Sequence, residues 1–175
     1  MHLVDERLLQ HPLTALQAAD GKKYRTTAAP VSGLLRIMGI RVKNELTDQW
    51  KEHGVTDSRQ YSSLTQAVHK GTFGITPKEH KATKGLKRQN LRDNMTTLET
   101  VLTMLGETTT AELTKTQNPD GFKENYRIAQ QGGSIAGETR KHIEKLTGRP
   151  VVSSLNANGL FHGEDNAPAI ATTLA

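Results

Sequence analysis

Two helix-start motifs constrain this chain more than any other feature of its sequence. "TPKE" at residues 76–79 and "TTLE" at residues 96–99 each place a threonine three residues before a glutamate. In such a capping box the threonine oxygen accepts a backbone N–H of the first turn, and the glutamate accepts the N–H of the threonine. Pro77 strengthens the first motif, because proline suits the first helical position. Each motif therefore predicts the start of an α-helix.

Apolar spacing adds to the helical pattern on both sides of these motifs. The second box precedes apolar residues at i, i+3, i+4 and i+7, namely Leu98, Val101, Leu102 and Leu105. Upstream, an apolar face made of Val42, Leu46 and Trp50 predicts a helix from residue 41 that Gly54 ends. A following helix begins after Thr56 or Asp57, carries Tyr61, Leu64 and Val68 on its apolar side, and is expected to end at Gly71.

Small residues mark the last long helical stretch, residues 122–148. Ala129, Gly133 and Ala136 place them on one side of a helix, where another backbone can approach closely. Two readings stay open for the adjacent Gly132 and Gly133. The helix continues through them, or it breaks there, since two glycines cost about 2 kcal/mol in a helix interior.

These patterns predict an all-α fold, a compact helical domain of about six helices with little or no strand. Any strand is confined to residues 20–32 or to the region of residues 151–152. We divide the chain into an N-terminal arm or short helices over residues 1–40, a helical domain over residues 41–153, and a flexible C-terminal tail over residues 154–175.

Composition and motifs argue against several classes of function. The chain has no cysteine, which excludes disulfides, thiolate metal sites and a cysteine nucleophile. No apolar run approaches the roughly 20 residues of a membrane helix, and no export signal is recognised, so we expect a cytoplasmic protein. The seven histidines lack a metal-ligand spacing, and we interpret them as surface residues. We therefore expect no catalytic residues, cofactor or metal, and an enzyme is the weakest alternative.

Positive charge is concentrated in one segment. Residues 69–92 contain seven Lys or Arg and one acid, Glu79. Such a cluster suits phosphates or an acidic protein surface, whereas a solvated face paired with neighbouring acids is the plainer reading. The candidate residues for binding a partner or nucleic acid are Lys78, Lys81, Lys84, Lys87, Arg88 and Arg92. Only Phe73 is an aromatic neighbour, which argues against a base-stacking platform.

Several longer motifs resemble a known family. They are "TFG-TPKEHK", "GLKRQNLRDNMT-LE", "TMLGE" and "GG-IAG-TRK-IEK-TG--VVS", where hyphens mark skipped residues. They are similar to the C-terminal region of DNA-damage-inducible protein D (DinD) and of phage antirepressors with a BRO-type N-terminal domain. The resemblance covers residues 41–153, which makes the helical domain DinD-like. The chain departs from the family at residues 1–40, because this segment is too short to hold the BRO-type domain.

What the resemblance implies is regulation linked to the SOS response to DNA damage, or to phage induction. We expect an antirepressor-like protein that binds and modulates another protein, such as a repressor or a recombination protein. The alternative is a nucleic-acid-binding module that uses the basic segment 69–92. A second copy of the chain is also a candidate partner, because aromatic content is only 4% and the small residues of 129–136 offer a packing face.

Overall fold

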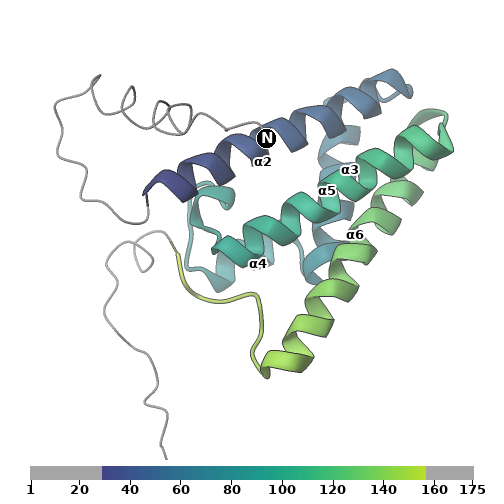
Figure 1. The fold of residues 1–175 in the computed structure, drawn as a ribbon. Helices are drawn as coiled ribbons and strands as arrows, with labels where there is room; N and C mark the ends of the chain where they lie inside the picture. Colours follow the sequence, from purple (N-terminus) through teal and green to yellow (C-terminus); the bar gives the residue numbers. More distant parts are fainter. Residues whose placement is uncertain (1–28, 157–175) are drawn as a thin grey trace, which may run out of the picture. The chain divides into compact units, whose positions relative to one another are not determined.

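The computed structural model describes residues 29–156, with side chains from residue 33 onward. It contains five α-helices and one short 3-10 helix: α2 (Ala29–Glu52), α3 (Ser58–Phe73), α4 (Pro77–Thr83), η2 (Arg92–Asn94), α5 (Thr97–Gln117) and α6 (Gly121–Thr147) (Figure 1). The described residues contain no strand, so the predicted all-α fold is confirmed and residues 151–152 form none. The chain divides into two units, Met1–Val31 and Ser32–Ala175. The description below concerns the second.

The predicted helix-start motifs are confirmed in detail. Thr76 Oγ1 accepts the N–H of Glu79 at 3.2 Å, and Glu79 Oε2 accepts the N–H of Thr76 at 2.7 Å. Thr96 and Glu99 form the same reciprocal pair, at 3.3 and 2.6 Å. Of the two candidates for capping α3, Asp57 is the one that accepts a backbone N–H of the first turn. Local sequence therefore sets where α3, α4 and α5 begin.

Two helix ends differ from expectation. The helix predicted from Arg41 is the second half of α2, which begins at Ala29 and so crosses the boundary drawn between residues 40 and 41. Gly71 was expected to end α3, but the helix continues to Phe73 and stops at Gly74, whose φ of 75° is left-handed. Gly74 suits that position because glycine adopts positive φ without a steric penalty.

Gly71 does not end a helix but lets α3 and α6 pack closely. The same packing decides whether α6 continues through Gly132 and Gly133 or breaks there. α6 runs unbroken from Gly121 to Thr147. A β-carbon on Gly71 would lie 2.9 Å from the Cα of Gly133, and one on Gly133 would lie 2.5 Å from the carbonyl oxygen of Val68. Gly132 has equally little room against Thr110 of α5. The glycines therefore let the backbones of α3, α5 and α6 meet, and this close packing keeps α6 helical despite its low propensity.

Two groups of buried apolar side chains make up the core. The first joins α2, α3, α5 and α6 and contains Leu46, Trp50, Val55, Leu64, Ala67, Val68, Ala111 and Ala129. The second lies where the ends of α3, α5 and α6 meet the chain on either side of η2, and contains Phe73, Leu91, Met95, Leu102 and Val151. Of the predicted apolar faces, Leu46 and Trp50 of α2 and Leu64 and Val68 of α3 belong to the first group. Tyr61 of α3 packs against it, and Val42 of α2 is not part of it. On α5 only part of the predicted face is buried, since Leu98 and Val101 are exposed.

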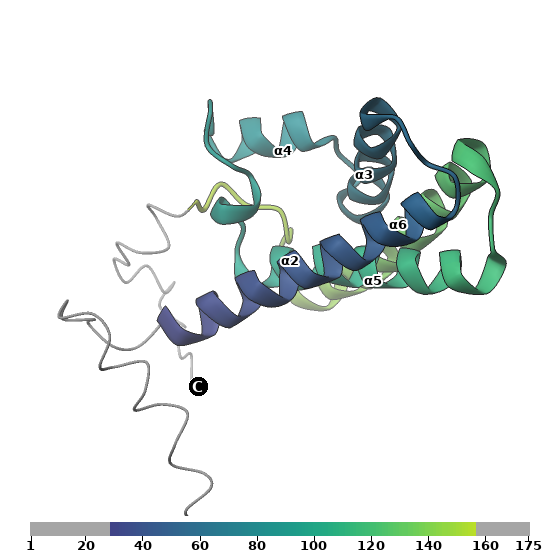
Figure 2. The ribbon, with the colours of Figure 1, turned by 90° about the horizontal axis from the view of Figure 1, so that it is seen from above.

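α2 lies over α5 when the two views of the ribbon are compared (Figures 1 and 2). Lys115 Nζ of α5 reaches Glu45 Oε1 of α2 at 2.6 Å. Leu46 and Trp50 supply the apolar part of the contact. A β-carbon added at Gly33 of α2 would meet nothing within 4 Å, and one at Gly39 would first meet the side chain of Arg92, whereas Gly71 and Gly133 face backbone. α2 is therefore held through side chains.

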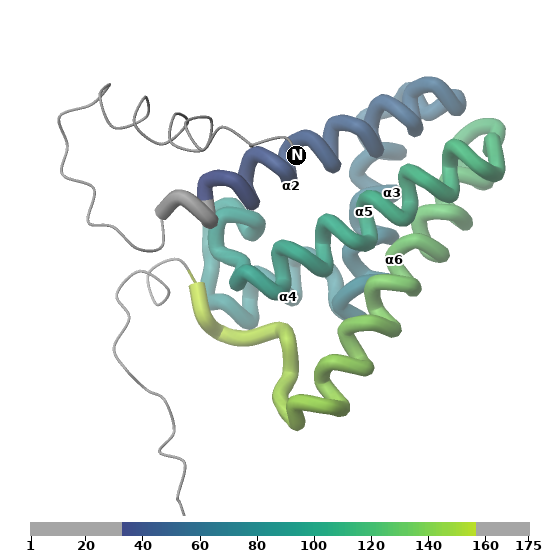
Figure 3. Tube along the Cα trace, viewed as in Figure 1, coloured from purple at the N-terminus to yellow at the C-terminus, as the bar shows by residue number. Residues whose placement is uncertain are grey.

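The chain returns from the end of α6 toward the segment after α4 (Figure 3). Val151 packs in the second apolar group. The carbonyls of Ser153 and Leu155 accept hydrogen bonds from Lys84 Nζ, and Asn156 Nδ2 donates to the carbonyl of Lys84. The first three residues of the predicted C-terminal tail, 154–156, are thus held against the helical domain. The rest of that tail lies outside the described residues.

Candidate binding surface

The basic segment singled out from the sequence separates into a buried part and an exposed part. Pro77 begins the short helix α4, which carries Lys78 and Lys81, and Gly85 then turns the chain with a φ of 66°. Lys78, Lys87 and Arg88 are exposed, and Lys81 is partly exposed. Lys84 is buried and Arg92 is mostly so. The six residues do not form one continuous basic surface.

Lys84 is fully enclosed, with 1% of its surface exposed. Its Nζ lies 2.8 Å from Glu99 Oε2 and donates to the carbonyls of Ser153 at 3.2 Å and Leu155 at 2.6 Å. All three donors of the ammonium group therefore have an acceptor. Lys84 holds the end of the domain together and is removed from the set of residues that can touch a partner.

Two histidines extend this buried network, which corrects their interpretation as surface residues. His80 has no exposed surface, and its Nε2 lies 3.3 Å from Glu99 Oε1. Its Nδ1 lies 3.3 Å from Nε2 of the mostly buried His69. Burial, together with the neighbouring His80, lowers the pKa of His69 to about 4. The ring of His69 is therefore neutral at pH 7.

Glu99 is the charged centre of the network. Burial alone would raise its pKa, but hydrogen bonds from His80, Lys84 and the N–H of Thr96 outweigh that effect and lower the pKa to about 2. A histidine beside a carboxylate is a common catalytic arrangement. Here both side chains have 0% exposure, so neither reaches a substrate. The geometry supports a structural role.

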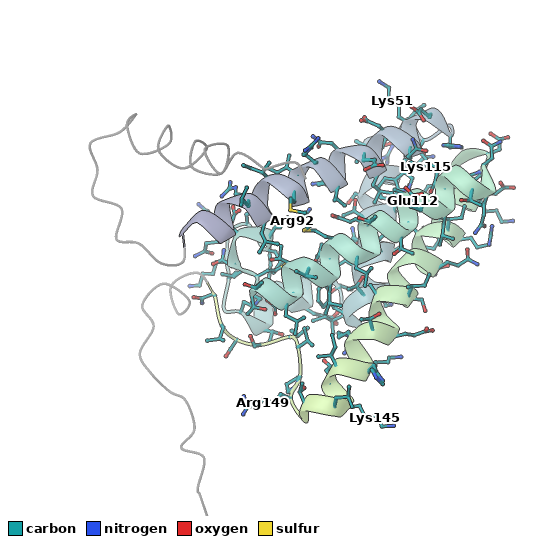
Figure 4. The ribbon with its side chains drawn as sticks, in the orientation of Figure 1. Lys51, Arg92, Glu112, Lys115, Lys145 and Arg149 are labelled. Carbon is teal, nitrogen blue, oxygen red and sulfur yellow. The ribbon has the colours of Figure 1, made fainter. Side chains whose placement is uncertain are left out.

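Arg92 is the second residue of the basic set that is engaged internally. Its NH1 and NH2 donate to Glu107 Oε1 and Oε2 at 3.1 and 2.7 Å, a two-point contact between η2 and α5. Figure 4 shows the side chain between α2 and α5. It also lies against Gly39 of α2, where an added β-carbon would be 3.2 Å from Arg92. Burial raises the pKa of Glu107, and Arg92 opposes that rise.

The exposed cations differ from these two in having no acidic partner among the residues that the structure describes. Within residues 33–156, no carboxylate lies within ion-pair distance of Lys78, Lys81, Lys87 or Arg88. Their positive charge therefore faces solvent uncompensated by an ion pair. It remains available to attract an acidic surface or a phosphate backbone.

An apolar surface that sequence reasoning missed lies on α2. Leu34, Ile37 and Met38 are spaced i, i+3 and i+4, and are 62%, 57% and 53% exposed. Ile40 beside them is 49% exposed. We call these four residues the outer face of α2. The available signal was the run "GLLRIMGI", residues 33–40, which has apolar residues all round a helix. Within this run only Gly39 is buried, against the side chain of Arg92.

The outer face and the exposed cations belong to neighbouring parts of the fold. Arg36 of α2 forms an ion pair with Asp93 of η2 at 3.2 Å, and Arg92 reaches Gly39. The segment that carries Lys87 and Arg88 thus leads to η2, which contacts α2 at Arg36 and Gly39. The arrangement offers a partner both apolar contact and positive charge.

The small residues of α6 contribute nothing to this surface. Ala129 and Ala136 are 0% exposed, and Gly133 is buried against α3. The packing face that suggested a second copy of the chain is therefore occupied inside the monomer.

Other kinds of site find no support in the described part of the chain. No cluster of three His, Asp or Glu side chains there is arranged to hold a metal ion. None of its helices has the length and apolar character to cross a membrane. Comparison with protein-family models and with curated proteins finds no match to this chain.

Proposed function

We propose that this chain is a regulatory protein that acts by binding another protein. Its partner would be a repressor or a recombination protein, in the setting of phage induction or the SOS response. The resemblance of residues 41–153 to the DinD and antirepressor group supports this setting. The outer face of α2 supports the mode of action, and it is the observation on which the proposal rests.

Exposed apolar side chains that cluster on one helix are typical of a protein-binding site. Leu34, Ile37 and Met38 can lie in an apolar groove at i, i+3 and i+4, the spacing by which a helix docks into a partner. The neighbouring Lys87 and Arg88 favour a partner with acidic residues around that groove. Charge of this kind speeds association more than it strengthens the final complex.

The test begins with capture of partners by the full-length chain from cells with an induced DNA-damage response. Each captured protein is then purified, and its dissociation constant is measured with the wild-type chain and with the double variant Ile37→Glu, Met38→Glu. We expect affinity to fall about a hundredfold, because two apolar anchors of a central patch are lost.

A matched control comes from the far end of α6. Leu146 is 73% exposed and lies next to Lys145, away from α2 (Figure 4). Leu146→Glu makes the same chemical change outside the outer face and should leave affinity unchanged. Equal affinities for the wild type and the double variant, with both folded by circular dichroism, would refute the proposal.

Nucleic-acid binding remains the second candidate, because the exposed cations form no ion pair with any acid of the described residues. A phosphate contact predicts that affinity for random duplex DNA falls with salt, by a slope of about −0.9 per phosphate in a log–log plot. Lys87→Ala and Arg88→Ala should then each reduce that slope by about one. Tight and salt-sensitive binding of random DNA by the full chain would favour this candidate over the first.

A further inference from the structure

A cavity of about 170 Å³ lies between α2, α3, α5 and the chain around η2. Six of the side chains that line it are apolar and buried: Leu46, Trp50, Val68, Phe73, Leu91 and Met95. An apolar cavity of about 150 Å³ can hold a benzene molecule. The apolar part of a ligand that fits here is therefore about one six-membered ring.

The walls of the cavity carry one positive charge in excess. The titratable side chains that line it are Lys43, His69, Arg92 and Glu107. Arg92 and Glu107 neutralise each other through their two-point contact, and His69 is neutral at pH 7 because burial lowers its pKa to about 4. Lys43 forms no ion pair with any acid of residues 33–156. Its ammonium group is thus the charge in excess.

The position of Lys43 along α2 places it on the side of the helix that faces the cavity. One face of α2 carries, at spacings of four, three and four residues, Gly39, Lys43, Leu46 and Trp50. At one end of this face Gly39 lies against Arg92. At the other end Leu46 and Trp50 are buried in the first apolar group. Lys43 therefore lies between the charged pair of the wall and its apolar part.

Lys43 also marks the mouth of the cavity. It is exposed, as are Thr65 of α3 and Asn90 before η2, and all three line the cavity. Its charge acts inward as well: burial raises the pKa of Glu107 on α5, and Arg92 and the charge of Lys43 oppose that rise. A ligand can therefore enter beside Lys43 and keep a charged group near solvent while its apolar part is buried.

We propose that this cavity binds a small monocarboxylate, whose apolar ring fills the cavity and whose carboxylate pairs with the ammonium group of Lys43. An apolar pocket with a few well-placed polar groups is the usual form of a small-molecule site. One negative charge balances the excess charge of the walls, whereas a second would have no partner there. Because the carboxylate stays at the mouth, the ion pair avoids the large desolvation cost of full burial.

The test compares benzoate with three related probes, in titrations of the full-length protein followed by ¹H–¹⁵N correlation spectra. Benzamide has the shape of benzoate without its charge, acetate has the charge without the ring, and 1-naphthoate has the charge and a second ring. We expect benzoate to bind and to shift the indole signal of Trp50, the only tryptophan in the chain, because an aromatic ring then lies beside it.

Each of the other probes should bind about tenfold more weakly than benzoate, or weaker still. Benzamide loses the interaction between two charged groups, acetate buries no ring, and 1-naphthoate is too large for the cavity. A contact made only at the surface predicts a different order, because 1-naphthoate would then bind at least as well as benzoate through its larger apolar area.

Two lysines of α2 make a matched pair of variants. Lys43→Met keeps an unbranched side chain and removes the charge, so it should weaken benzoate binding about tenfold and leave benzamide binding unchanged. Lys51 is also exposed, and it lies in the last turn of α2, away from Arg92 (Figure 4). It does not line the cavity, so Lys51→Met should bind benzoate as the wild type does.

The proposal is overturned if benzoate leaves the spectrum unchanged up to its solubility limit. It is also overturned if benzamide, acetate or 1-naphthoate binds as tightly as benzoate, or if Lys43→Met binds benzoate with the affinity of the wild type.

Discussion

The close meeting of α3 and α6 gives a prediction with a definite sign. Gly133→Ala adds one methyl group, and that carbon would lie 2.5 Å from the carbonyl oxygen of Val68 and 3.0 Å from its Cα. These are backbone atoms of a packed helix, and they cannot move aside as a flexible side chain can. The two helices must separate to admit the methyl group.

The expected magnitude combines two opposing effects. Alanine is favoured over glycine in a helix by about 1 kcal/mol, and this part of the change stabilises the variant. Overpacking of a tight core costs about 1–3 kcal/mol or more, and contacts with backbone place this case at or above the upper end. We expect a net loss of about 2 kcal/mol, or about 6 °C in melting temperature for a protein of this size.

Gly33→Ala is the matched control for this prediction. Gly33 also lies in a helix, α2, and a β-carbon there would meet nothing within 4 Å. The same change should therefore raise stability, by up to about 1 kcal/mol. Thermal unfolding followed by circular dichroism measures both variants. If Gly133→Ala also raised the melting temperature, the close approach of α3 and α6 would be refuted.

Two further predictions concern the buried network. Lys84→Met should cost about 3–5 kcal/mol in urea unfolding, because it leaves the Glu99 carboxylate buried without its ammonium partner. Lys87→Met at an exposed position should cost little, and equal losses would contradict the burial of Lys84. Stability should also fall as the pH drops from 6.5 toward 4, since the pKa of His69 is about 4 in the folded protein against 6.5 as its ordinary value. The unfolded chain then binds the extra proton, and the loss approaches about 3 kcal/mol. His69→Gln should flatten this part of the stability curve, whereas a curve that His69→Gln leaves unchanged would argue against the neutral buried ring.

The features that sequence predicts well here are those decided within one helical turn. The capping box of Thr76 and Glu79 depends on four consecutive residues, and so does that of Thr96 and Glu99, which is why both could be placed in advance. The left-handed glycines at 54 and 148 follow from the same local chemistry. The all-α fold follows from these signals together.

What sequence could not supply depends on residues far apart in the chain. Gly71 is the kind of residue that often ends a helix, and the sequence alone suggests that role. In the fold it instead lets α3 pack against Gly133 of α6, a contact between residues far apart in the chain. Lys84 lies among other cations and is distinguished from Lys87 only by meeting Glu99 and the returning segment after α6. The outer face of α2 was missed because Arg36 interrupts the short apolar run of residues 33–40 and Arg41 ends it.

The glycine contacts divide the molecule into positions that tolerate change and positions that do not. A new side chain at Gly71, Gly132 or Gly133 must be matched by rearrangement of a second helix, so single substitutions there lower stability. Leu34, Ile37 and Met38 face solvent, and replacing them leaves the contacts among α3, α5 and α6 untouched. The chain can therefore acquire a different surface on α2 in single steps while its fold stays the same.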